Sequence, residues 1–508
     1  MNRYPLARVR TGLALLALAL PAAGQDLKSF EERTTVHKLA NGWTFILVNR
    51  PLAPVFSFCT LADVGSAQEV PGITGLAHMF EHMAFKGSSK VGTKDWDTEQ
   101  KALAAVETAY RAYQTERLAP RPDPQKVEKL VADFQARQQE AGRHVDTENG
   151  FGSLLAREGA TGINATTGTD DTRFFYSLPA NKLELFAFLE SERFLDPVFR
   201  EFYVERNVVQ EERRMTENSP MGRLDEQFQM AAFQAHPYQQ PVVGHMSDLQ
   251  SFTATDAEAF FKTYYAPSNL ITVIVGDVDA RAAIPSLEKY FGRIPARPGP
   301  SPLRTVEPPQ NGEKTIVLEH AAQPIYMEGY HKPADSHPDQ AIYAAINDIF
   351  SRGRTSRLHR ALVRDRKLAF QIGSFSGYPG KKYPNLWAIF AMPAAGVTNE
   401  QVQEVIRAEI ERLRTEDVTD EELARFKTRA QADLLRAMRD NAMLAGLLAE
   451  HQQLYGDWRE LFLTLDRLDR VTKADIRRVA GEVFQKNNRT VAMAVTRPGK
   501  GTAPEAAQ

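Results

Sequence analysis

Cysteine is almost absent from this chain, which has one such residue, Cys59, among 508. A single cysteine cannot form an intramolecular disulfide, and it excludes the Cys-x-x-Cys motifs of many redox and structural zinc sites. Cys59 lies in an apolar, strand-like run at residues 55–61. We therefore expect it to be a small core residue and not a nucleophile.

An excess of one charge is also absent. Lysine and arginine number 62, and aspartate and glutamate number 64, so the formal net charge is -2. This balance gives no support for binding to nucleic acid or to an anionic membrane surface. Hydrophobic residues make up 43% and charged residues 25%, which is ordinary for a globular chain long enough to form two to four domains.

Long hydrophobic runs are absent beyond the N-terminus. There, three arginines precede a short apolar run at residues 11–20, and small residues follow it. This order is typical of a secretory signal peptide, which we predict at residues 1–24 with cleavage before Gln25. The run is too short to span a bilayer as a helix. We expect an exported, periplasmic protein with no stable membrane insertion.

The rest of the chain predicts an α+β fold built from two similar units. Strand and helix patterns follow a similar order at residues 25–296 and 313–498, although the two segments share little residue identity. A proline-rich segment at residues 297–312 predicts a linker between them. We expect each unit to be an antiparallel-rich mixed sheet with helices packed on it, and residues 499–508 to be a disordered tail.

Two segments depart from this regular order. Residues 25–35 are expected to be a mobile lead-in to the first strand. An insertion at about residues 97–149 is rich in Ala, Glu, Gln, Lys and Arg and predicts two helices, at residues 101–117 and 125–139, joined by a proline-rich turn. We expect this helical hairpin to be a solvated spacer; a wall, a lid and a partner contact are the alternatives.

The most informative stretch is residues 75–87, an apolar segment that carries His78, Glu81 and His82. The histidines are four residues apart, so on a helix both lie on one face and can bind one metal ion. Glu81 lies near that face and is a natural general base for a metal-activated water. The order is H-x-x-E-H, the reverse of the commoner H-E-x-x-H. A buried histidine is usually a hydrogen-bonded core residue, but three such groups on one apolar stripe favour metal binding.

A catalytic zinc site needs a third protein ligand and an open fourth position. The candidates are the acids of a helix predicted at residues 201–217, which carries Glu205, Glu211 and Glu212. Glu205 and Glu212 are seven residues apart, about two helical turns, so they face the same way. Glu211 points about 100° away from Glu212, so both cannot face one ion. A solvated helix face is the alternative for each of these acids.

Residues 75–87 closely resemble the inverted-zincin (pitrilysin/insulinase-type) metallopeptidases, in their bacterial processing-peptidase-like branch. The pattern Glu-Arg-x-Val-x-x-x-Glu, which begins at Glu205, resembles a second motif of the same family. The resemblance implies that His78, His82 and Glu212 bind one zinc ion per chain. It implies that Glu205 is a carboxylate that does not bind the zinc itself but hydrogen-bonds to one of the zinc ligands and orients it.

The same resemblance implies the other parts of the site. Glu81 matches the catalytic base, and Asn164, Ala165 and Thr166 match an edge strand beside the zinc that pairs with the peptide backbone. The implied architecture is half of a clamshell, in which two α+β units enclose a chamber with two others. The insertion at about residues 97–149 has no counterpart in the usual pattern.

One departure from the family pattern concerns the second unit. Many members carry there an arginine and, seven residues later, a tyrosine, which reach the scissile carbonyl. The matching residues here are Val363 and Phe370, and neither side chain can donate a hydrogen bond. Arg364 is one position out of register. Some bacterial relatives divide the zinc and the Arg/Tyr pair between two chains, and this chain resembles the zinc-bearing partner.

The sequence therefore predicts an exported Zn2+-dependent endopeptidase that hydrolyses peptides or unfolded segments. We expect a homodimer, or a heterodimer with a related chain that supplies the Arg/Tyr pair. The alternative is a partner-dependent or non-catalytic structural subunit of a peptidase-like assembly. The intact H-x-x-E-H motif argues against that alternative, whereas Val363 and Phe370 argue for dependence on a partner.

Overall fold

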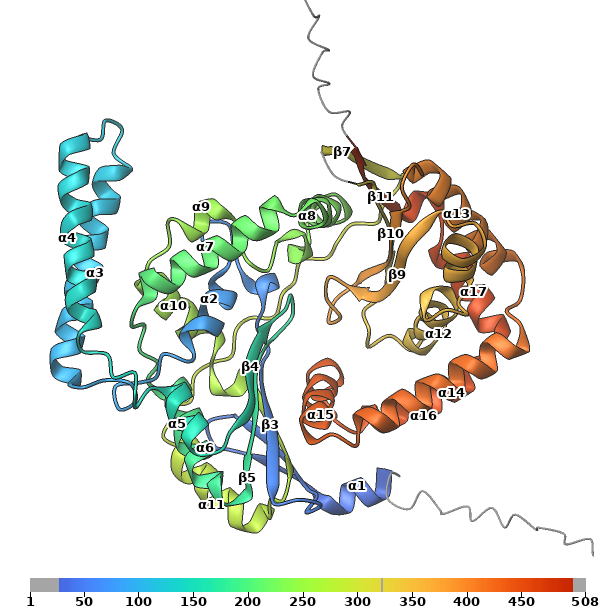
Figure 1. Ribbon diagram of the computed structural model, residues 1–508. Helices are drawn as coiled ribbons and strands as arrows, with labels where there is room; N and C mark the ends of the chain where they lie inside the picture. Colours follow the sequence, from blue (N-terminus) through green and yellow to red (C-terminus); the bar gives the residue numbers. More distant parts are fainter. Residues whose placement is uncertain (1–26, 321–322, 497–508) are drawn as a thin grey trace, which may run out of the picture.

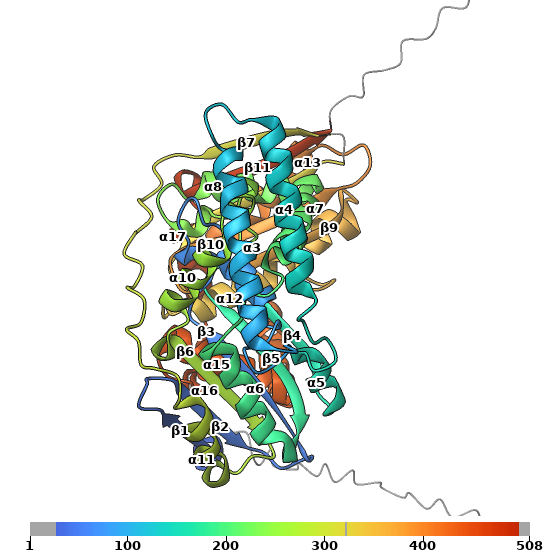
Figure 2. The same cartoon turned by 90° about the vertical axis from the view of Figure 1, so that its left-hand side faces the viewer.

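The computed structural model describes residues 27–320 and 323–496, so the predicted signal peptide and tail lie outside the described residues. The chain forms two α+β lobes that face each other, one drawn in blue to green and the other in yellow to red (Figure 1). Residues 292–313 form no helix or strand, and this connection runs along the outside of the molecule (Figure 2). The predicted fold class is confirmed.

Each lobe is built on one sheet, and the two sheets share a topology. The first has the order β1-β2-β6-β3-β5-β4 and the second the order β7-β11-β8-β10-β9. The pairs β2–β6 and β7–β11 are parallel, and all other pairs are antiparallel. Apart from β1, the second sheet therefore repeats the first strand for strand. The strands are β1 (Thr34–Lys38), β2 (Thr44–Asn49), β3 (Val55–Ala62), β4 (Thr161–Thr167), β5 (Thr172–Pro179), β6 (Leu270–Gly276), β7 (Lys314–His320), β8 (Ile325–Lys332), β9 (Ala369–Tyr378), β10 (Asn385–Pro393) and β11 (Arg489–Thr496).

The order of the helices along the chain is also similar in the two lobes. The first lobe contains α1 (Leu27–Arg33), α2 (Leu76–Met83), α3 (Trp96–Arg117), α4 (Pro124–Gly142), α5 (Phe151–Arg157), α6 (Leu183–Leu195), α7 (Phe202–Asn218), α8 (Pro220–Ala232), α9 (Met246–Leu249), α10 (Ala254–Tyr264) and α11 (Ala280–Phe291). The second contains α12 (Gln340–Ser351), the π-helix η5 (His359–Asp365), α13 (Asn399–Thr415), α14 (Asp420–Ala437), α15 (Asn441–Tyr455), α16 (Glu460–Arg470) and α17 (Lys473–Val483).

Several of these helices begin at a capping threonine. Thr253, Thr398, Thr419 and Thr472 each accept a hydrogen bond from a backbone N–H three residues on, and the acidic or amide side chain there bonds back to the threonine N–H. These reciprocal bonds satisfy N–H groups that the helix itself leaves free. The helix starts are therefore set by local sequence.

The two lobes exchange helices across their boundary. From the second lobe, α15 packs on the first sheet, where its buried Leu444 and Leu448 contact a cluster that includes Ile46 and Val273. From the first lobe, α8 packs on the second sheet, where Phe228 joins a cluster with strands β8, β10 and β11. Each sheet is thus covered on one face by a helix from the other lobe, and neither lobe buries its own sheet alone.

The structure corrects two expectations from the sequence. Residues 27–33 form helix α1 and not a mobile lead-in, because Phe30 is buried against Phe462 of α16, with ring centroids 4.7 Å apart. The sequence pattern of residues 356–363 predicts an ordinary helix there, and the structure has a π-helix at residues 359–365. Both corrections involve contacts or backbone geometry that the local sequence does not encode.

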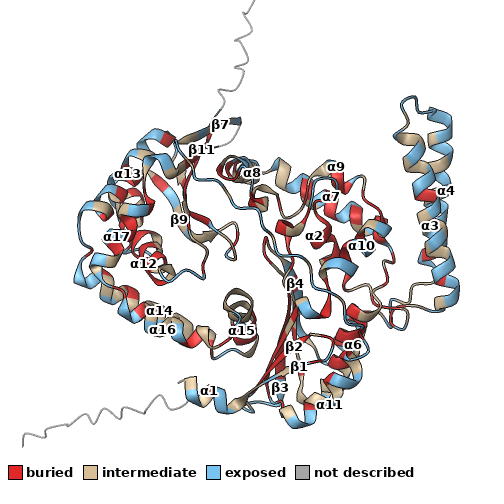
Figure 3. Cartoon of the chain, turned by 180° about the vertical axis from the view of Figure 1, so that it is seen from behind, coloured by how far each residue is buried: buried red, intermediate tan, exposed pale blue. Residues whose placement is uncertain are grey.

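The insertion forms an antiparallel pair of helices, α3 and α4, that projects from the first lobe (Figures 1 and 2). Most of α4 is exposed, and Ala141 is its one buried residue (Figure 3). At its base, α3 buries Glu99, Val106 and Tyr110 against the lobe. Within residues 27–320 and 323–496, the structure contains no helix long and apolar enough to cross a membrane.

We expect Leu448→Ala to lower the stability of the whole protein against unfolding, because Leu448 is fully buried between α15 and the first sheet. The cavity left by a buried leucine costs about 2–5 kcal/mol in free energy of unfolding. Leu52→Ala is the matched control, because Leu52 is 78% exposed, and a change of at most about 0.5 kcal/mol is expected there. Urea unfolding of both variants measures the difference. Equal midpoints for the two variants would contradict the exchanged packing.

Candidate metal centre

Helix α2 is anchored at its N-terminus by two buried carboxylates. Glu69 accepts hydrogen bonds from the backbone N–H groups of Gly75 and Ala77, at 2.7 Å each. Asp248 accepts from the N–H groups of Gly72 and Thr74 and from the Thr74 hydroxyl. Burial raises the pKa of Glu69 to about 8, and the two N–H donors act in the opposite direction. These contacts fix where the helix begins.

The two faces of α2 divide its residues by chemistry. Leu76, Met79, Phe80 and Met83 are buried in the core of the first lobe. The helix therefore turns its polar face toward α7 and β4, against which it packs. The alternation of apolar and polar positions on one short helix places all three residues of the H-x-x-E-H motif on that polar face.

The structure brings His78, His82 and Glu212 together. The distance from His78 Nε2 to Glu212 Oε2 is 3.5 Å, and that from His82 Nε2 to Glu212 Oε1 is 3.7 Å. One donor atom from each of the three residues lies within 4.8 Å of the others. Two imidazoles and one carboxylate form a donor set of catalytic zinc sites, with a fourth position left for water or substrate. The three residues therefore fit a zinc ion.

Glu205 lies behind His82, as the motif suggests. Its Oε2 is 3.3 Å from His82 Nδ1, and its Oε1 is 2.6 Å from Lys86 Nζ. The hydrogen bond with His82, assisted by Lys86, lowers the pKa of Glu205 to about 2, so this carboxylate is charged. A proton on Nδ1 of His82 satisfies the contact and leaves Nε2 free to face Glu212.

Glu211 is placed away from the cluster. Its side chain is 67% exposed and pairs with Arg214 on the same helix. The neighbouring acid Glu212 is the one that faces both histidines. The structure thus distinguishes the two acids that helical spacing leaves as rivals.

Burial shifts the pKa of both Glu81 and His78. Burial raises the pKa of Glu81, while Thr167 and His82 act in the opposite direction. Burial, with a smaller contribution from His82, lowers the pKa of His78 to about 4. His78 is therefore neutral near pH 7, the form in which imidazole binds a metal. Thr167, at the end of β4, is a neighbour of Glu81 that the sequence did not indicate.

Strand β4 provides an open edge beside the cluster. It is the last strand of its sheet and pairs with β5 alone. Ala165 is buried toward α2, whereas Asn164 and Thr166 are exposed on the other face. The free N–H and C=O groups of such an edge can pair with an extended peptide.

The second lobe presents no polar side chain at the two positions of the family's Arg/Tyr pair. Val363 packs against the second core, and Phe370 is 54% exposed at the start of β9. Arg364 is bound to Asp365, with Nε 2.6 Å from Oδ1. The chain thus supplies neither donor from these positions.

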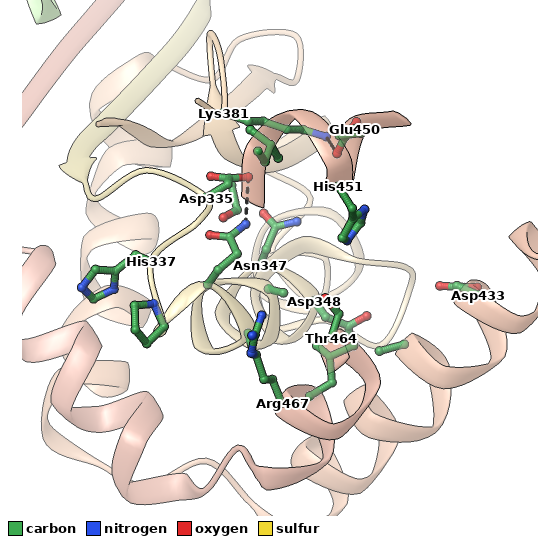
Figure 4. Close-up of a pocket in the computed structure, with 18 of the residues that line it drawn as sticks. Asp335, His337, Asn347, Asp348, Lys381, Asp433, Glu450, His451, Thr464 and Arg467 are labelled. Atoms are coloured by element: carbon green, nitrogen blue, oxygen red, sulfur yellow. Dashed lines mark hydrogen bonds and ion pairs between the residues drawn. The ribbon is translucent and has the colours of Figure 1, made fainter. Parts of the chain in front are cut away.

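The place that corresponds to the metal centre in the second lobe has different chemistry. Like α2, helix α12 follows the central antiparallel strand of its sheet and packs on the edge strand β9 and on α14. Counted back from Gly87 and Gly353, which follow the two helices, the positions of the motif are Ala344, Asn347 and Asp348. These line a pocket of about 410 Å³ (Figure 4).

In the second lobe, the position that corresponds to the metal site holds an ion pair. Arg429 of α14 donates to Asp348 at 3.1–3.2 Å. A guanidinium cannot be a metal ligand, and its positive charge opposes the binding of a cation. Among the residues that the structure describes, His78, His82 and Glu212 are the one cluster suited to a metal.

A buried guanidinium joins the elements that carry the cluster. Arg200, two residues before the first residue of α7, is 1% exposed and pairs with the fully buried Glu99 of α3, with Nε 2.7 Å from Oε1. It also donates to the carbonyl oxygens of Lys86, Ser88 and Val91 in the loop after α2. Arg200 therefore connects the histidine helix, the glutamate helix and the insertion.

Further contacts attach α3 along α7. Tyr203 donates to Glu107, and Arg206 donates to the Tyr110 hydroxyl, at 2.5 Å each. The rings of Tyr110 and Tyr203 lie 4.1 Å apart. The base of the insertion is thus part of the support of the metal centre, whereas the sequence predicted a solvated spacer. No local sequence signal points to Arg200 or Glu99, because their pairing spans about a hundred residues.

Two imidazoles and one carboxylate, with the carboxylate of Glu81 on the same helix face, form the donor set and the base that a metal-dependent hydrolase needs. Residues 45–136 match the family described as Insulinase (Peptidase family M16), and residues 251–430 match the Peptidase M16 inactive domain. The chain belongs to the M16 family of zinc proteases. The absence of a metal cluster from the described part of the second lobe agrees with the name of its domain.

Similar proteins cover nearly the whole chain. Zinc protease PqqE of Helicobacter pylori is 28% identical over 96% of this chain and 99% of its own. The crystal structure of a protease from Helicobacter pylori is 26% identical, with a TM-score of 0.75 over 92% of this chain and 99% of that one. The first half of the periplasmic protease PqqL from Escherichia coli is 17% identical with a TM-score of 0.65, over 92% of each chain. The match covers 48% of complete PqqL.

Substitution of the carboxylates should separate their roles in zinc binding. Glu205→Gln should weaken zinc affinity by about 10–100-fold, the usual effect of losing the hydrogen-bond partner of a metal ligand. Glu212→Gln, which removes a ligand oxygen's charge, should weaken it further. Glu211→Gln is the matched control and should bind as the unaltered protein does. Chelator-competition titrations measure all three, and a larger loss in Glu211→Gln than in Glu212→Gln would reverse the assignment.

The buried pair of Arg200 and Glu99 should be needed for stability. Glu99→Gln leaves the Arg200 charge without its counter-ion, which typically costs about 3–5 kcal/mol in free energy of unfolding. Glu258→Gln is the control, because Glu258 and its partner Lys262 are both more than half exposed, and such pairs contribute about 0–1 kcal/mol. Urea unfolding compares them. A loss in Glu99→Gln no greater than that in Glu258→Gln would show that α3 does not support α7.

Proposed function

We propose that this protein is an exported zinc endopeptidase that hydrolyses peptides or unfolded segments. The observation that carries the proposal is the convergence of His78, His82 and Glu212, with Glu81 on the same face of α2. When bound by these three residues, zinc would lower the pKa of a water toward about 7 and polarise a peptide carbonyl. One zinc ion per chain follows from one such cluster in the described residues.

The chain's own residues supply the remaining steps. The carboxylate of Glu81 would take a proton from the attacking water and return it to the leaving amine nitrogen. Glu205 and Lys86 hold the His82 ring in place and keep its tautomer fixed. Asn164, Ala165 and Thr166 of β4 would hold the substrate as an added strand, because backbone pairing suits an extended peptide of any sequence.

A partner-dependent activity is the second candidate. Val363 and Phe370 offer no donor to a developing oxyanion, and loss of one such donor can cost about 10²–10³ in rate. The match to one half of PqqL supports a pairing of two such chains. We propose a homodimer, or a heterodimer with a related chain that carries the Arg/Tyr pair. A non-catalytic subunit is the weaker form of this candidate, since all four residues of the metal centre are present.

The N-terminal sequence supports a periplasmic location. The basic start and short apolar run are typical of a signal peptide that is cleaved before Gln25. In that compartment, the substrates would be exported peptides or unfolded segments of exported proteins.

The deciding experiment is hydrolysis of a quenched fluorescent peptide by the mature protein, with and without zinc. Glu81→Gln should lower kcat by at least about 10²-fold, because a general base contributes about 10²–10⁴-fold, and it should keep its zinc. Glu211→Gln is the control for a lost surface carboxylate near the site and should retain full activity. Chelation of the zinc should abolish hydrolysis, and readdition should restore it.

The possible failures point in different directions. A zinc-loaded but inactive protein that gains activity with a related chain would establish dependence on a partner. A folded protein that binds no zinc and cleaves nothing would reject the peptidase and leave the structural role. Equal activity of Glu81→Gln and the unaltered protein would reject Glu81 as the base.

A further inference from the structure

At the open edge formed by β4, the first sheet has two faces, and the metal centre lies on one of them. The register with β5 pairs Ala165 with Phe174 on the α2 side, and Asn164 with Phe175 on the opposite side. Helix α15 of the second lobe lies on that opposite side (Figure 1). Successive side chains of an added strand point to alternate faces. A peptide bound along β4 would therefore direct every second side chain away from the metal centre and toward α15.

A cavity of about 290 Å³ lies on the α15 side of this edge. Its lining includes Thr166 of β4, Phe175 of β5, and Met443, Gly446 and Leu447 of α15. The walls are mainly hydrocarbon, and Met443, which is one of the lining residues, is also exposed to solvent. The volume lies near the lower end of the range of ligand pockets, about 300–1,000 Å³, and suits one large side chain more than a whole ligand.

The other groups that line the cavity offer no free charge. Arg173 is held by Asp171 at 2.7 Å and by Glu450 at 3.1 Å, and Glu450 also binds Lys381 at 2.7 Å. Cys59, which also lines the cavity, is buried, and burial raises the pKa of its thiol to about 12, so it is neutral. A charged side chain that entered here would lose its hydration without gaining a partner. The cavity therefore favours an apolar occupant.

We propose that this cavity is a specificity subsite that takes a bulky apolar side chain, such as leucine, methionine or phenylalanine, of a peptide bound along β4. The inference rests on the proposed function for the presence of the peptide, and it names the class of substrate. It assigns the selection of substrate jointly to both lobes, since Thr166 and Phe175 come from the first and α15 comes from the second.

Gly446 allows the cavity to be filled without disturbing the fold. A Cβ built at Gly446 meets no atom within 4 Å, and the residue lies inside helix α15, where glycine is a poor helix former. Gly446→Leu would place its side chain in the cavity, and Gly446→Ala would fill it in part. Gly481→Leu is the matched control, because a Cβ there also meets no atom within 4 Å and Gly481 lies in α17, outside the cavity lining.

The experiment moves one leucine, or one aspartate, along an alanine- and serine-based quenched peptide. Cleavage is measured as kcat/KM for the zinc-loaded protein. Binding of the fluorescein-labelled peptides is measured by anisotropy in the Glu81→Gln background. Leucine at one position should be preferred over alanine by at least about 10-fold, the scale of discrimination by an apolar pocket, and aspartate there should be disfavoured. The leucine-to-alanine ratio should fall to about 2 or less in Gly446→Leu, fall partway in Gly446→Ala, and stay unchanged in Gly481→Leu.

The binding measurement separates the two proposals. A leucine preference in binding that Gly446→Leu removes supports the subsite, even if no peptide is cleaved and the peptidase proposal fails. Binding with no leucine preference at any position overturns the subsite, whether or not the peptides are cleaved. A preference that persists in Gly446→Leu also overturns it, because the selecting group then lies elsewhere.

Discussion

The geometry of the metal centre depends on one buried guanidinium. Arg200 and Glu99 are at most 1% exposed, so both have lost their hydration, a cost that the ion pair alone does not always offset. The cost is offset here because Arg200 also donates to the carbonyl oxygens of Lys86, Ser88 and Val91. Those carbonyls belong to the loop after α2, while Arg200 leads into α7. One side chain therefore joins the loop after the histidine helix to the start of the helix that carries Glu212.

The loop around this guanidinium shows the same constraint in its backbone. Gly87 and Gly92 both have positive φ, at 88° and 84°. A Cβ at either position would lie 3.0–3.1 Å from Arg200 Nη1. Only glycine combines this backbone conformation with so close an approach. The insertion enters at the same point through Glu99, so it acts as a support of α7 as well as a projection into solvent.

The sequence predicted features that depend on neighbouring residues, and it missed contacts between residues that are far apart in the chain. The four-residue spacing of His78 and His82 placed them on one face, and strand and helix patterns predicted most elements and the repeat of the fold. The choice between Glu211 and Glu212 needed a family resemblance, because helical spacing separates two neighbouring acids without showing which one faces the metal. The contacts of Arg200, the neighbour Thr167 and the burial of Phe30 arise from tertiary packing, and no local pattern encodes them.

The exchange of helices belongs to the same class of missed information. An amphipathic pattern shows that α8 and α15 must bury one face, but it does not show which sheet covers that face. The structure assigns each helix to the sheet of the other lobe. A division of the chain at the proline-rich connection would therefore separate each sheet from a helix that covers it, and the two lobes form one packed unit.

The difference between the lobes then has a physical explanation. A second metal centre would need ligands in place of Ala344 and Asp348 on α12 and the removal of Arg429 from α14, so it lies several substitutions away on two helices. The second lobe keeps the scaffold without the metal chemistry, and its residues approach the first lobe most closely through α15. Because α15 packs against β3 and β6 and its Gly446 and Leu447 line a cavity together with Thr166 of β4, the lobe without the metal forms one wall of the cavity beside the strand edge on which the other lobe would hold its peptide.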